Sequence, residues 1–428
     1  MDFSPSPRAA ELTAAVREFI ATEIAPVEPE IHADIARRRL AGEDSWAVDP
    51  RVVELQRRAR EQGLWNLFLP AGHEGPYAER YGTRGGTGLS NLDYAPVAEE
   101  TGRSFLAPLV LNCNAPDTGN MEVLLKYGSQ EQKDRWLDPL LDGRIRSAFL
   151  MTEPDVASSD ASTMAATARI EGDEVVLDGR KWWSTGVGHP DCEIGIFMGV
   201  TDPDAHRHQR HSMVLVPMDA PGVTVERMLT AQGIHDEPLG HGEVRLEGVR
   251  VPVGNIIAGP GRAAEIAQGR LGPGRVHHCM RLIGLAEMAL DLACSRASSR
   301  VAFGKPIVNL GGNRERLAEA RIAIDQTRLL VLHAAWKLDT EGAAPVEVSA
   351  IKVAAPRMAQ QVVDMAIQLH GGGGMSDDFP LAGAYATARS LRLADGPDEV
   401  HLGVVARAML APYRDAARAA AGTTEAGR

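Results

Sequence analysis

The sequence has few cysteines and no paired-cysteine motif. Its four cysteines, Cys113, Cys192, Cys279 and Cys294, are widely separated, and none lies in a CxxC spacing. A zinc ribbon or a redox dithiol would need that spacing. Scattered thiols in a long chain are typical of proteins kept in a reducing compartment. The sequence therefore predicts neither a metal site nor a disulfide framework.

The sequence also lacks the apolar segments that membranes and export require. No stretch approaches about 18 uninterrupted apolar residues, the length that a membrane-spanning helix needs. The opening segment, MDFSPSPRAAELT, has no basic region followed by an apolar one, as a secretory signal would have. We therefore expect no membrane span, no secretory signal and a cytoplasmic location.

An excess of basic residues is missing as well. The chain has 45 Lys and Arg against 57 Asp and Glu, which gives a net charge of −12. This balance opposes non-specific binding to nucleic acids and to anionic membrane surfaces. No Walker A loop is present, and no GxGxxG follows a strand. Nucleotide binding of the P-loop or Rossmann type is therefore not supported.

What the sequence does contain is a change of pattern along the chain. Apolar residues such as Leu12, Val16 and Phe19 recur at helical spacing in the first third. Short β-rich runs separated by turns follow, and Ala-rich helical patterns return after Pro260. We predict an α+β protein with several domains. These are an N-terminal α-helical domain (1–147), a central antiparallel β-domain (148–260), a C-terminal helical part (261–416) and a tail (417–428).

Several segments have a structural interpretation. The Gly-rich residues 71–90 predict a loop, Ser129 a helix N-cap, and Asp178-Gly179 a hairpin turn. The polar cluster His206–His211 lies between two β-runs and predicts an exposed loop rather than a metal site. The glycines at 371–374 follow a helical pattern, which favours a helix C-cap and a turn.

A second histidine cluster lies inside a helical pattern. His277, His278 and Cys279 are consecutive there, and neighbouring helix positions point about 100° apart. They cannot easily share one metal ion. Core or interface packing is therefore the favoured interpretation.

Two adjacent tryptophans follow a strand pattern. Trp182 and Trp183 would point to opposite faces of a strand, so only one can face a common core. The other must cover a neighbouring helix layer or the wall of a site for a flat cofactor. Both interpretations stay open.

One carboxylate in the last break between helices also has two interpretations. The segment from Leu393 to His401 is acidic and opens a helix. Asp395 or Gly396 could be the N-cap and Pro397 the first helical residue. A carboxylate at this break could equally be a general base.

Taken together, five segments resemble the acyl-CoA dehydrogenase family over nearly the whole chain. The flavin loop of that family, TEPxxxSD, is similar to Met151–Asp160, with one extra residue. The other four segments, in chain order, are Tyr127–Gly143, Lys181–Gly186 (KWWSTG), Arg300–Ile307 (RVAFGKPI) and Gln368–Gly372 (QLHGG).

The resemblance implies a fold, a cofactor and a set of contacts. The fold is an N-terminal α-domain, a central β-domain and a C-terminal four-helix bundle, with FAD completed by a neighbouring subunit. A homodimer or homotetramer follows. The implied cofactor-binding residues are Met151, Thr152, Ser158, Ser159, Trp183, Ser184 and Thr185, with Arg300, Phe303, Gln368, Gly372 and Glu399. The implied substrate-binding residues are Ser159, Arg275 near the CoA moiety, and Gly396.

The chemistry implied is α,β-dehydrogenation of an acyl-CoA thioester. A carboxylate removes the α-proton, the β-hydrogen leaves as hydride to flavin N5, and an electron-transfer flavoprotein takes the electrons. Most members use a Glu, whereas the matching residue here is Asp395. The alternative position on the long helix is Gly274. Asp is shorter by about 1.5 Å, a shift that could cost on the order of 10²-fold in rate.

Some segments resemble one subgroup in particular. Trp182-Trp183, Asn114–Met121 and Ala394–His401 are similar to members that in animals are fused to a kinase-like domain and linked to long-chain and 4-hydroxy fatty acids.

Two other functions stay open. One is an acyl-CoA oxidase that uses O₂, and the other is a non-catalytic FAD-binding partner subunit of a hetero-oligomer.

Overall fold

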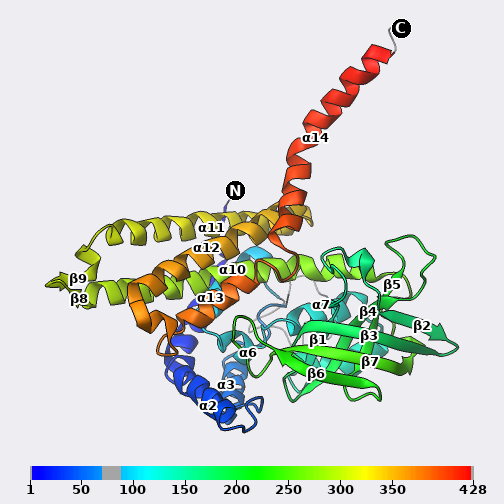
Figure 1. The fold of residues 1–428 in the computed structure, drawn as a ribbon, viewed down its shortest axis with the longest axis horizontal. Coiled ribbons are helices and arrows are strands. Elements are labelled where there is room, and N and C mark those ends of the chain that lie inside the picture. The colour runs from blue at the N-terminus through cyan, green and yellow to red at the C-terminus, as the bar shows by residue number, and fades with distance from the viewer. Residues whose placement is uncertain (1, 70–87, 426–428) are drawn as a thin grey trace. The chain divides into compact units, whose positions relative to one another are not determined.

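The computed structural model describes residues 2–69 and 88–425 (Figure 1). The chain forms two compact units, Met1–Leu285 and Ala286–Arg428, which are called the first and second unit below. The loop predicted at 71–90 lies almost wholly outside the described residues. None of the described helices combines the length and the apolar character needed to cross a membrane.

The first unit begins with short helices whose starts carry clear signals. The Ser6, Asp49 and Ser90 side chains each accept a hydrogen bond from a backbone N–H of the helix that follows. The predicted cap at Ser129 is confirmed as a full capping box with Gln132. The helices are α1 (Pro7–Phe19), α2 (Glu28–Leu40), α3 (Pro50–Glu61), α5 (Asn91–Thr101), α6 (Ala107–Val110), α7 (Asp117–Tyr127), α8 (Gln130–Gln132) and α9 (Asp138–Leu141).

A seven-stranded sheet follows, in the order β1-β4-β2-β3-β7-β6 with β5 paired to β4. Its strands are β1 (Arg146–Leu150), β2 (Thr167–Glu171), β3 (Glu174–Thr185), β4 (Cys192–Val200), β5 (His211–Pro217), β6 (Val223–Leu229) and β7 (His241–Pro252). Most pairs are antiparallel, as predicted, but β1 runs parallel to β4. Turn residues reveal only the direction of consecutive strands, so this non-consecutive pair left no signal in the sequence.

Two local predictions for the sheet differ in outcome. Asp178-Gly179 does not turn a hairpin, because it lies inside β3 at a register shift opposite β7. A Cβ on Gly179 would lie 2.4 Å from the Cβ of Ala166, so this glycine serves close packing. The predicted loop is confirmed for His206–Arg210, which lie between β4 and β5, whereas His211 begins β5 and is buried.

The second unit is helical, as predicted for the C-terminal part. The unit boundary falls inside the long helix α10 (Ala263–Ser299). A small hairpin follows, β8 (Val301–Ala302) with β9 (Lys305–Pro306). The remaining helices are α11 (Asn313–Glu341), α12 (Pro345–His370), α13 (Leu381–Ser390) and α14 (Asp398–Glu425). The glycines predicted to end a helix form a 3-10 turn after α12.

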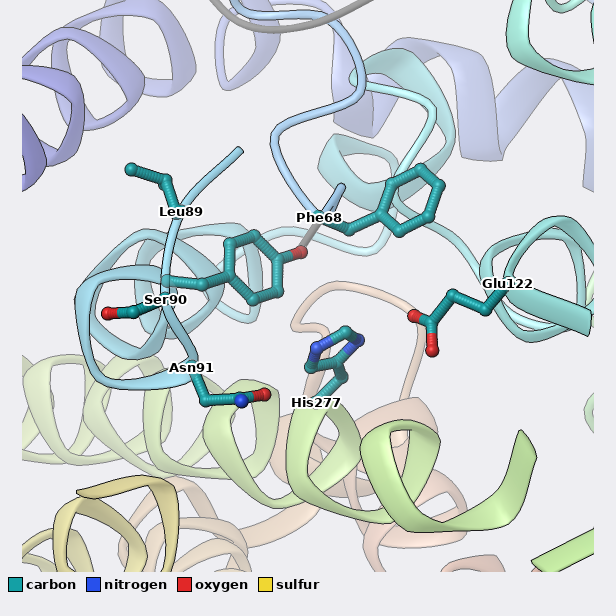
Figure 2. A pocket seen from close by; sticks show the side chains of 7 residues that line it. Phe68, Leu89, Ser90, Asn91, Glu122 and His277 are labelled. Atoms are coloured by element: carbon teal, nitrogen blue, oxygen red, sulfur yellow. The ribbon is translucent and has the colours of Figure 1, made fainter. Parts of the chain in front are cut away.

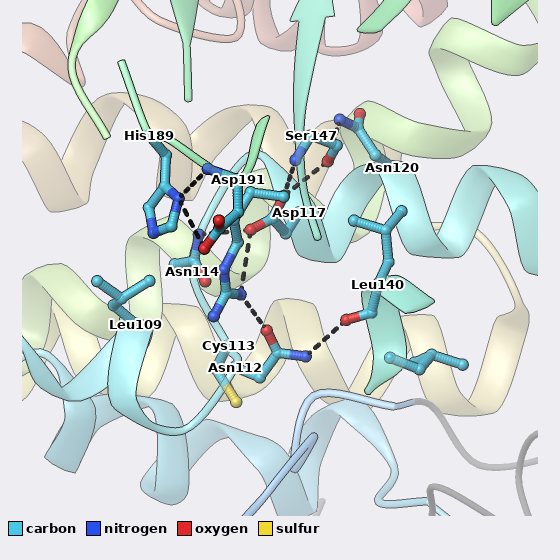
Figure 3. A network of polar contacts seen from close by, with 12 residues as sticks. Leu109, Asn112, Cys113, Asn114, Asp117, Asn120, Leu140, Ser147, His189 and Asp191 are labelled. Carbon is cyan, nitrogen blue, oxygen red and sulfur yellow. Dashed lines mark hydrogen bonds and ion pairs between the residues drawn. The ribbon is translucent and has the colours of Figure 1, made fainter. Parts of the chain in front are cut away.

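A buried polar network fixes the start of α7 to β1 in the first unit (Figure 3). Asp117 accepts hydrogen bonds from the Ser147 backbone N–H at 2.8 Å and from its hydroxyl at 2.6 Å. The other carboxylate oxygen of Asp117 lies 3.0 Å from Asn114 Nδ2 and 3.4 Å from Arg146 Nη1. A buried carboxylate that accepts from this many donors holds the two elements together.

We expect Asp117→Asn to lower the free energy of unfolding by about 3 kcal/mol, because it leaves the Arg146 charge buried without its partner. Urea unfolding followed by far-UV circular dichroism measures the change. Asp142→Asn is the matched control, since Asp142 pairs with exposed Arg60 and Arg144 and should cost less than about 1 kcal/mol. Equal effects of the two substitutions would contradict the role given to the buried network.

Candidate functional site

The loop after β1 is held in place by a fully buried lysine. Lys181 on β3 has no exposed surface. Its Nζ donates to the Met151 carbonyl at 2.9 Å, the Met198 carbonyl at 2.7 Å and Glu153 Oε1 at 2.7 Å. These three acceptors use all three hydrogens of the ammonium group. The motif residues around position 151 are thereby fixed against the sheet.

Glu153 ties the same loop to itself. Its carboxylate accepts from the backbone N–H groups of Ala165 at 2.8 Å and Ala166 at 3.0 Å. Its own backbone N–H donates to the Ser158 hydroxyl at 2.9 Å. Sequence reasoning quoted Glu153 and Lys181 inside motifs but gave neither a role. An acidic residue in one motif, Glu153, and a basic residue in the following motif, Lys181, were the signal from which an ion pair could have been predicted.

The two charges of this pair change each other's pKa. Burial lowers the pKa of Lys181 to about 8, and the neighbouring Glu153 charge opposes that fall. Burial alone would raise the pKa of Glu153, but the Lys181 charge, its hydrogen bond and the two backbone amides hold it below its usual value. Both groups are therefore ionised near neutral pH.

The two tryptophans lie side by side, contrary to the expectation of opposite faces. Trp183 has a left-handed backbone (φ 51°), and the pairing of β3 with β7 shifts register between Lys181 and Ser184. This bulge breaks the alternation of a regular strand, and the ring centroids of Trp182 and Trp183 are 6.4 Å apart. The Trp183 side chain remains 42% exposed.

Polar groups flank this exposed indole. Thr185 Oγ1 lies 2.9 Å from His241 Nδ1, and the His241 ring lies 5.7 Å from the Trp183 ring. Sequence reasoning missed His241, whose position opposite Thr185 on β7 is set by strand register. Ser184, in contrast, is fully buried, and its hydroxyl has no hydrogen-bond partner among the described residues. The result is a flat aromatic wall beside a hydroxyl and an imidazole.

The two candidate serines of the loop differ in their surroundings. The Ser158 hydroxyl is engaged with the Glu153 backbone, whereas Ser159 is exposed. Thr152 and Met151 are half-buried, and the Thr152 carbonyl accepts from the Trp182 N–H at 2.9 Å. The structure therefore brings the loop and the tryptophan bulge together within the first unit.

A small pocket in the first unit contains none of the residues predicted to bind cofactor or substrate (Figure 2). It is lined by Phe68, Leu89, Ser90, Asn91, Tyr94, Glu122 and His277. The rings of Tyr94 and His277 meet edge to face at 4.8 Å, and both are buried. The packing interpretation of His277 is thus confirmed. The described residues contain no cluster of three or more potential metal ligands.

The second unit contains the turn with Asp395. Asp395 has a left-handed backbone (φ 57°), and Gly396 follows with φ 104°. Helix α14 begins at Asp398, so its N-cap position falls on Pro397. The interpretation of Asp395 or Gly396 as the cap, with Pro397 as the first helical residue, is therefore wrong. Asp398, the first residue of α14, is buried.

Asp398 is buried because two guanidinium groups meet it. Arg392 donates to Asp398 Oδ2 through Nε at 3.0 Å and Nη2 at 2.8 Å. Arg357 on α12 donates to the same oxygen at 3.0 Å. Burial would raise the pKa of Asp398, but the hydrogen bonds and charges of the two arginines hold it below its usual value. This cluster ties the turn to α12.

Other residues implied by the resemblance are exposed in the second unit. Phe303 lies at the tip of the β8–β9 hairpin, where it is 95% exposed and left-handed (φ 50°). Such a position favours glycine. A bulky aromatic residue with this backbone conformation costs conformational free energy, and such strain is typical of residues that contact a ligand or another subunit. Arg300, Gln368, Gly372 and Glu399 are exposed as well. Arg275 is half-buried on α10 of the first unit, where a Cβ on Gly274 would meet nothing within 4 Å.

Comparisons with known proteins give consistent results. Three family models match the chain: "Acyl-CoA dehydrogenase, N-terminal domain" over residues 6–144, the middle domain over 148–249 and the C-terminal domain over 261–410. A Mycobacterium abscessus structure described as an acyl-CoA dehydrogenase is 66% identical, with a TM-score of 0.91 over 96% of this chain and 100% of that chain.

Curated relatives support the same family. The mouse protein "Acyl-CoA dehydrogenase family member 10" is 51% identical over 94% of this chain, and the chain spans 37% of that protein's length. FadE2 of Mycobacterium tuberculosis, described as an acyl-CoA dehydrogenase, is 47% identical over 96% of this chain and 97% of its own. The match to the animal proteins agrees with the subgroup resemblance found in the sequence.

We expect Lys181→Met to destabilise the protein by about 3–5 kcal/mol, because it leaves the Glu153 charge buried and unpaired. The double variant with Glu153→Gln should cost less than the sum of the two single changes. Urea unfolding measures all three variants, and Lys126→Met, at an exposed lysine, is the matched control. Strict additivity would contradict a direct coupling between the two side chains.

The buried His277 predicts a loss of stability in acid. Burial, with the Arg281 and His278 charges, lowers the pKa of His277 from 6.5 to about 3. The unfolded chain therefore binds more protons below pH 6.5, and stability falls as the pH falls from 6.5 towards 3. His277→Gln should remove about 3 kcal/mol of the loss between pH 7 and 4. Thermal unfolding across this range measures it, and an unchanged slope would contradict the assignment. His206→Gln, in an exposed loop, is the control.

Proposed function

The chain belongs to the acyl-CoA dehydrogenase family, and we propose that it oxidises the Cα–Cβ bond of an acyl-CoA thioester. The family is FAD-dependent and acts on acyl-CoA substrates. In this proposal Asp395 takes the α-proton, and an electron-transfer flavoprotein receives the electrons. The left-handed turn that presents Asp395, between α13 and α14, is the observation that carries it.

The residues of the first unit fit a flavin. The exposed Trp183 indole offers a flat apolar face, and Thr185 and His241 offer hydrogen-bonding groups beside it. The flavin ring would lie against these groups and the loop that contains Thr152. Bound FAD would supply the acceptor for the hydride that leaves the β-carbon. Strain at a non-glycine residue such as Trp183 is typical of positions that serve a ligand.

The remaining contacts divide between substrate and a second subunit. Ser159, which is exposed, and Arg275 would hold the CoA part of the thioester. The exposed hairpin with Phe303 supports contact with the FAD of a partner subunit. The further residues proposed at that contact are Met151, Ser158, Ser184, Arg300, Gln368, Gly372 and Glu399, divided between the two chains as the family pattern implies. A homodimer or homotetramer is therefore part of the proposal, with no membrane or nucleic-acid partner.

Asp395 has a defined task in this reaction. A proton next to a thioester is weakly acidic, so its removal requires a carboxylate in position and hydrogen bonds to the developing enolate oxygen. Asp395 is the carboxylate at the family's usual position, and Gly274 supplies none at the alternative one. Backbone N–H groups of the Asp395–Gly396 turn would donate to the thioester oxygen.

The compartment is proposed from the thiols. None of the four cysteines forms a disulfide. Cys113 and Cys279 are buried, and Cys294 is exposed. Free, partly accessible thiols fit a reducing environment such as the cytoplasm.

Anaerobic titration with acyl-CoAs tests the proposed function. The flavin absorbance of the purified protein is followed with short, long, branched and 4-hydroxy acyl chains. Bleaching by one class supports dehydrogenation and names the substrate. A flavin spectrum that no thioester bleaches would favour a non-catalytic partner subunit, and rapid reoxidation of the bleached flavin by O₂ would favour an oxidase.

We expect Asp395→Asn to slow flavin reduction by a factor of about 10²–10⁴, the usual contribution of a general base. Stopped-flow absorbance under anaerobic conditions measures the rate. The flavin content should stay at the wild-type level, which separates lost proton transfer from lost cofactor. Asp364→Asn, at an exposed position on α12, is the matched control. Wild-type rates in Asp395→Asn would remove this residue from the mechanism.

A further inference from the structure

Buried side chains of α12 and α14 hold the turn that contains Asp395. Lys352 and Ser349 on α12 and His401 on α14 are 1%, 5% and 2% exposed. Ser349 and Lys352 are three positions apart and therefore share one face of α12. All three side chains reach the turn or one another, and none of them belongs to the site residues that the family pattern supplies.

The ammonium group of Lys352 donates hydrogen bonds to the backbone of the turn. Its Nζ donates to the Leu391 carbonyl and, at 3.4 Å, to the Gly396 carbonyl. A buried ammonium is costly unless its hydrogens are satisfied and its charge is balanced. A lysine at this place therefore closes the two ends of the turn, with Asp395 between them.

His401 holds the residue in the middle of the turn. His401 Nε2 lies 3.2 Å from the Asp395 carbonyl oxygen. A carbonyl only accepts, so Nε2 carries the hydrogen, and Nδ1 lies 3.3 Å from the Ser349 hydroxyl, which can donate or accept. A Cβ on Gly396 would lie 2.9 Å from His401 Nε2, so only glycine leaves room for this contact.

Fixing one carbonyl also fixes the N–H across the same peptide. In a trans peptide the C=O and the N–H point in opposite directions. With the Asp395 carbonyl turned to His401, the Gly396 N–H points away from it. No described residue accepts a hydrogen bond from the Gly396 N–H. This arrangement presents a backbone donor next to the carboxylate residue.

The described side chains around the turn carry more positive than negative charge. Arg357 and Arg392 both bind Asp398, so that carboxylate is already matched. Glu399 is exposed to water. Among these groups Lys352, Arg357 and Arg392 are positive, and Asp398 is the buried negative charge. The excess of positive charge favours the ionised form of Asp395.

We propose that Lys352 and His401 are positioning residues for Asp395, which fix its left-handed backbone and, through the Lys352 charge, favour its ionised form. The inference rests on the proposed function, because it assigns Asp395 as the base. Neither side chain touches the reacting atoms in this proposal. Each acts through the turn.

The test measures proton removal separately from oxidation. A 3-thia-acyl-CoA has sulfur at the β-position and no β-hydrogen to give up, whereas its α-proton can still exchange. Exchange into D₂O, followed by NMR in the presence of the flavin-loaded protein, reports the action of Asp395 alone. Lys352→Met keeps the length and burial of the side chain but removes the charge and the donors.

We expect Lys352→Met to slow α-proton exchange by about 10²-fold and to move the acid limb of its pH profile upward by about one unit. The flavin content and the KM for the analogue should stay near the wild-type values. Lys337→Met is the matched control, since Lys337 pairs with Glu341 and Glu347 away from the turn, and it should leave both the rate and the pH limb unchanged.

A second pair of variants keeps the test informative if Lys352→Met folds poorly. His401→Gln retains an N–H donor near the Nε2 position and should preserve most of the exchange, whereas His401→Phe should lose it. Thermal unfolding of each variant without flavin shows whether the fold survives. Conservative rescue of exchange at equal stability supports a positioning role.

The outcomes separate the positioning role of Lys352 and His401 from the assignment of Asp395 as the base. If Asp395→Asn abolishes exchange while Lys352→Met and His401→Phe keep the wild-type rate and pH limb, the positioning role is overturned and the proposed function stands. If Asp395→Asn exchanges as the wild type does, the assignment of the base is overturned, and the positioning role falls with it.

Discussion

A buried ammonium group that donates to backbone carbonyls holds a candidate functional segment in each of the two units. Lys181 has no exposed surface and binds the carbonyls of Met151 and Met198 together with Glu153. Lys352 is almost as buried and binds carbonyls at both ends of the Asp395 turn. Irregular backbone cannot satisfy its own carbonyls as helices and sheets do. A lysine with three hydrogens on one atom can replace several missing partners at once.

Three of the eight non-glycine residues with positive φ in the described part of the chain lie in motif segments. Trp183, Phe303 and Asp395 all have positive φ values near 50–57°. Left-handed conformations cost bulky residues free energy, and they persist only where the surroundings dictate them. The other five lie outside the motif segments, so strain by itself does not mark a functional residue.

Much of the fold could be predicted from the sequence, because its signals are local. Helical periodicity located α11 and α12, and the cap at Ser129 follows from a side chain and its near neighbours. Features that depend on distant residues could not be predicted. Examples are the parallel pairing of β1 with β4 and the bulge that brings Trp182 and Trp183 together. At the site, the candidate ligand-binding residues were predicted from motifs alone. The role of Lys181, in contrast, depends on carbonyls far along the chain and could not be predicted.

The shorter carboxylate makes the backbone around Asp395 more important than it would be for Glu. An Asp side chain has one fewer rotatable bond and reaches about 1.5 Å less, so it cannot correct a misplaced backbone by changing its rotamer. The position of its carboxylate follows from φ, ψ and two side-chain torsions. Buried donors at the carbonyls of Asp395 and Gly396 fix the first of these. The shorter reach of the side chain is thus offset by rigidity in the turn, and the position of the proposed base depends on α12 and α14 as much as on Asp395 itself.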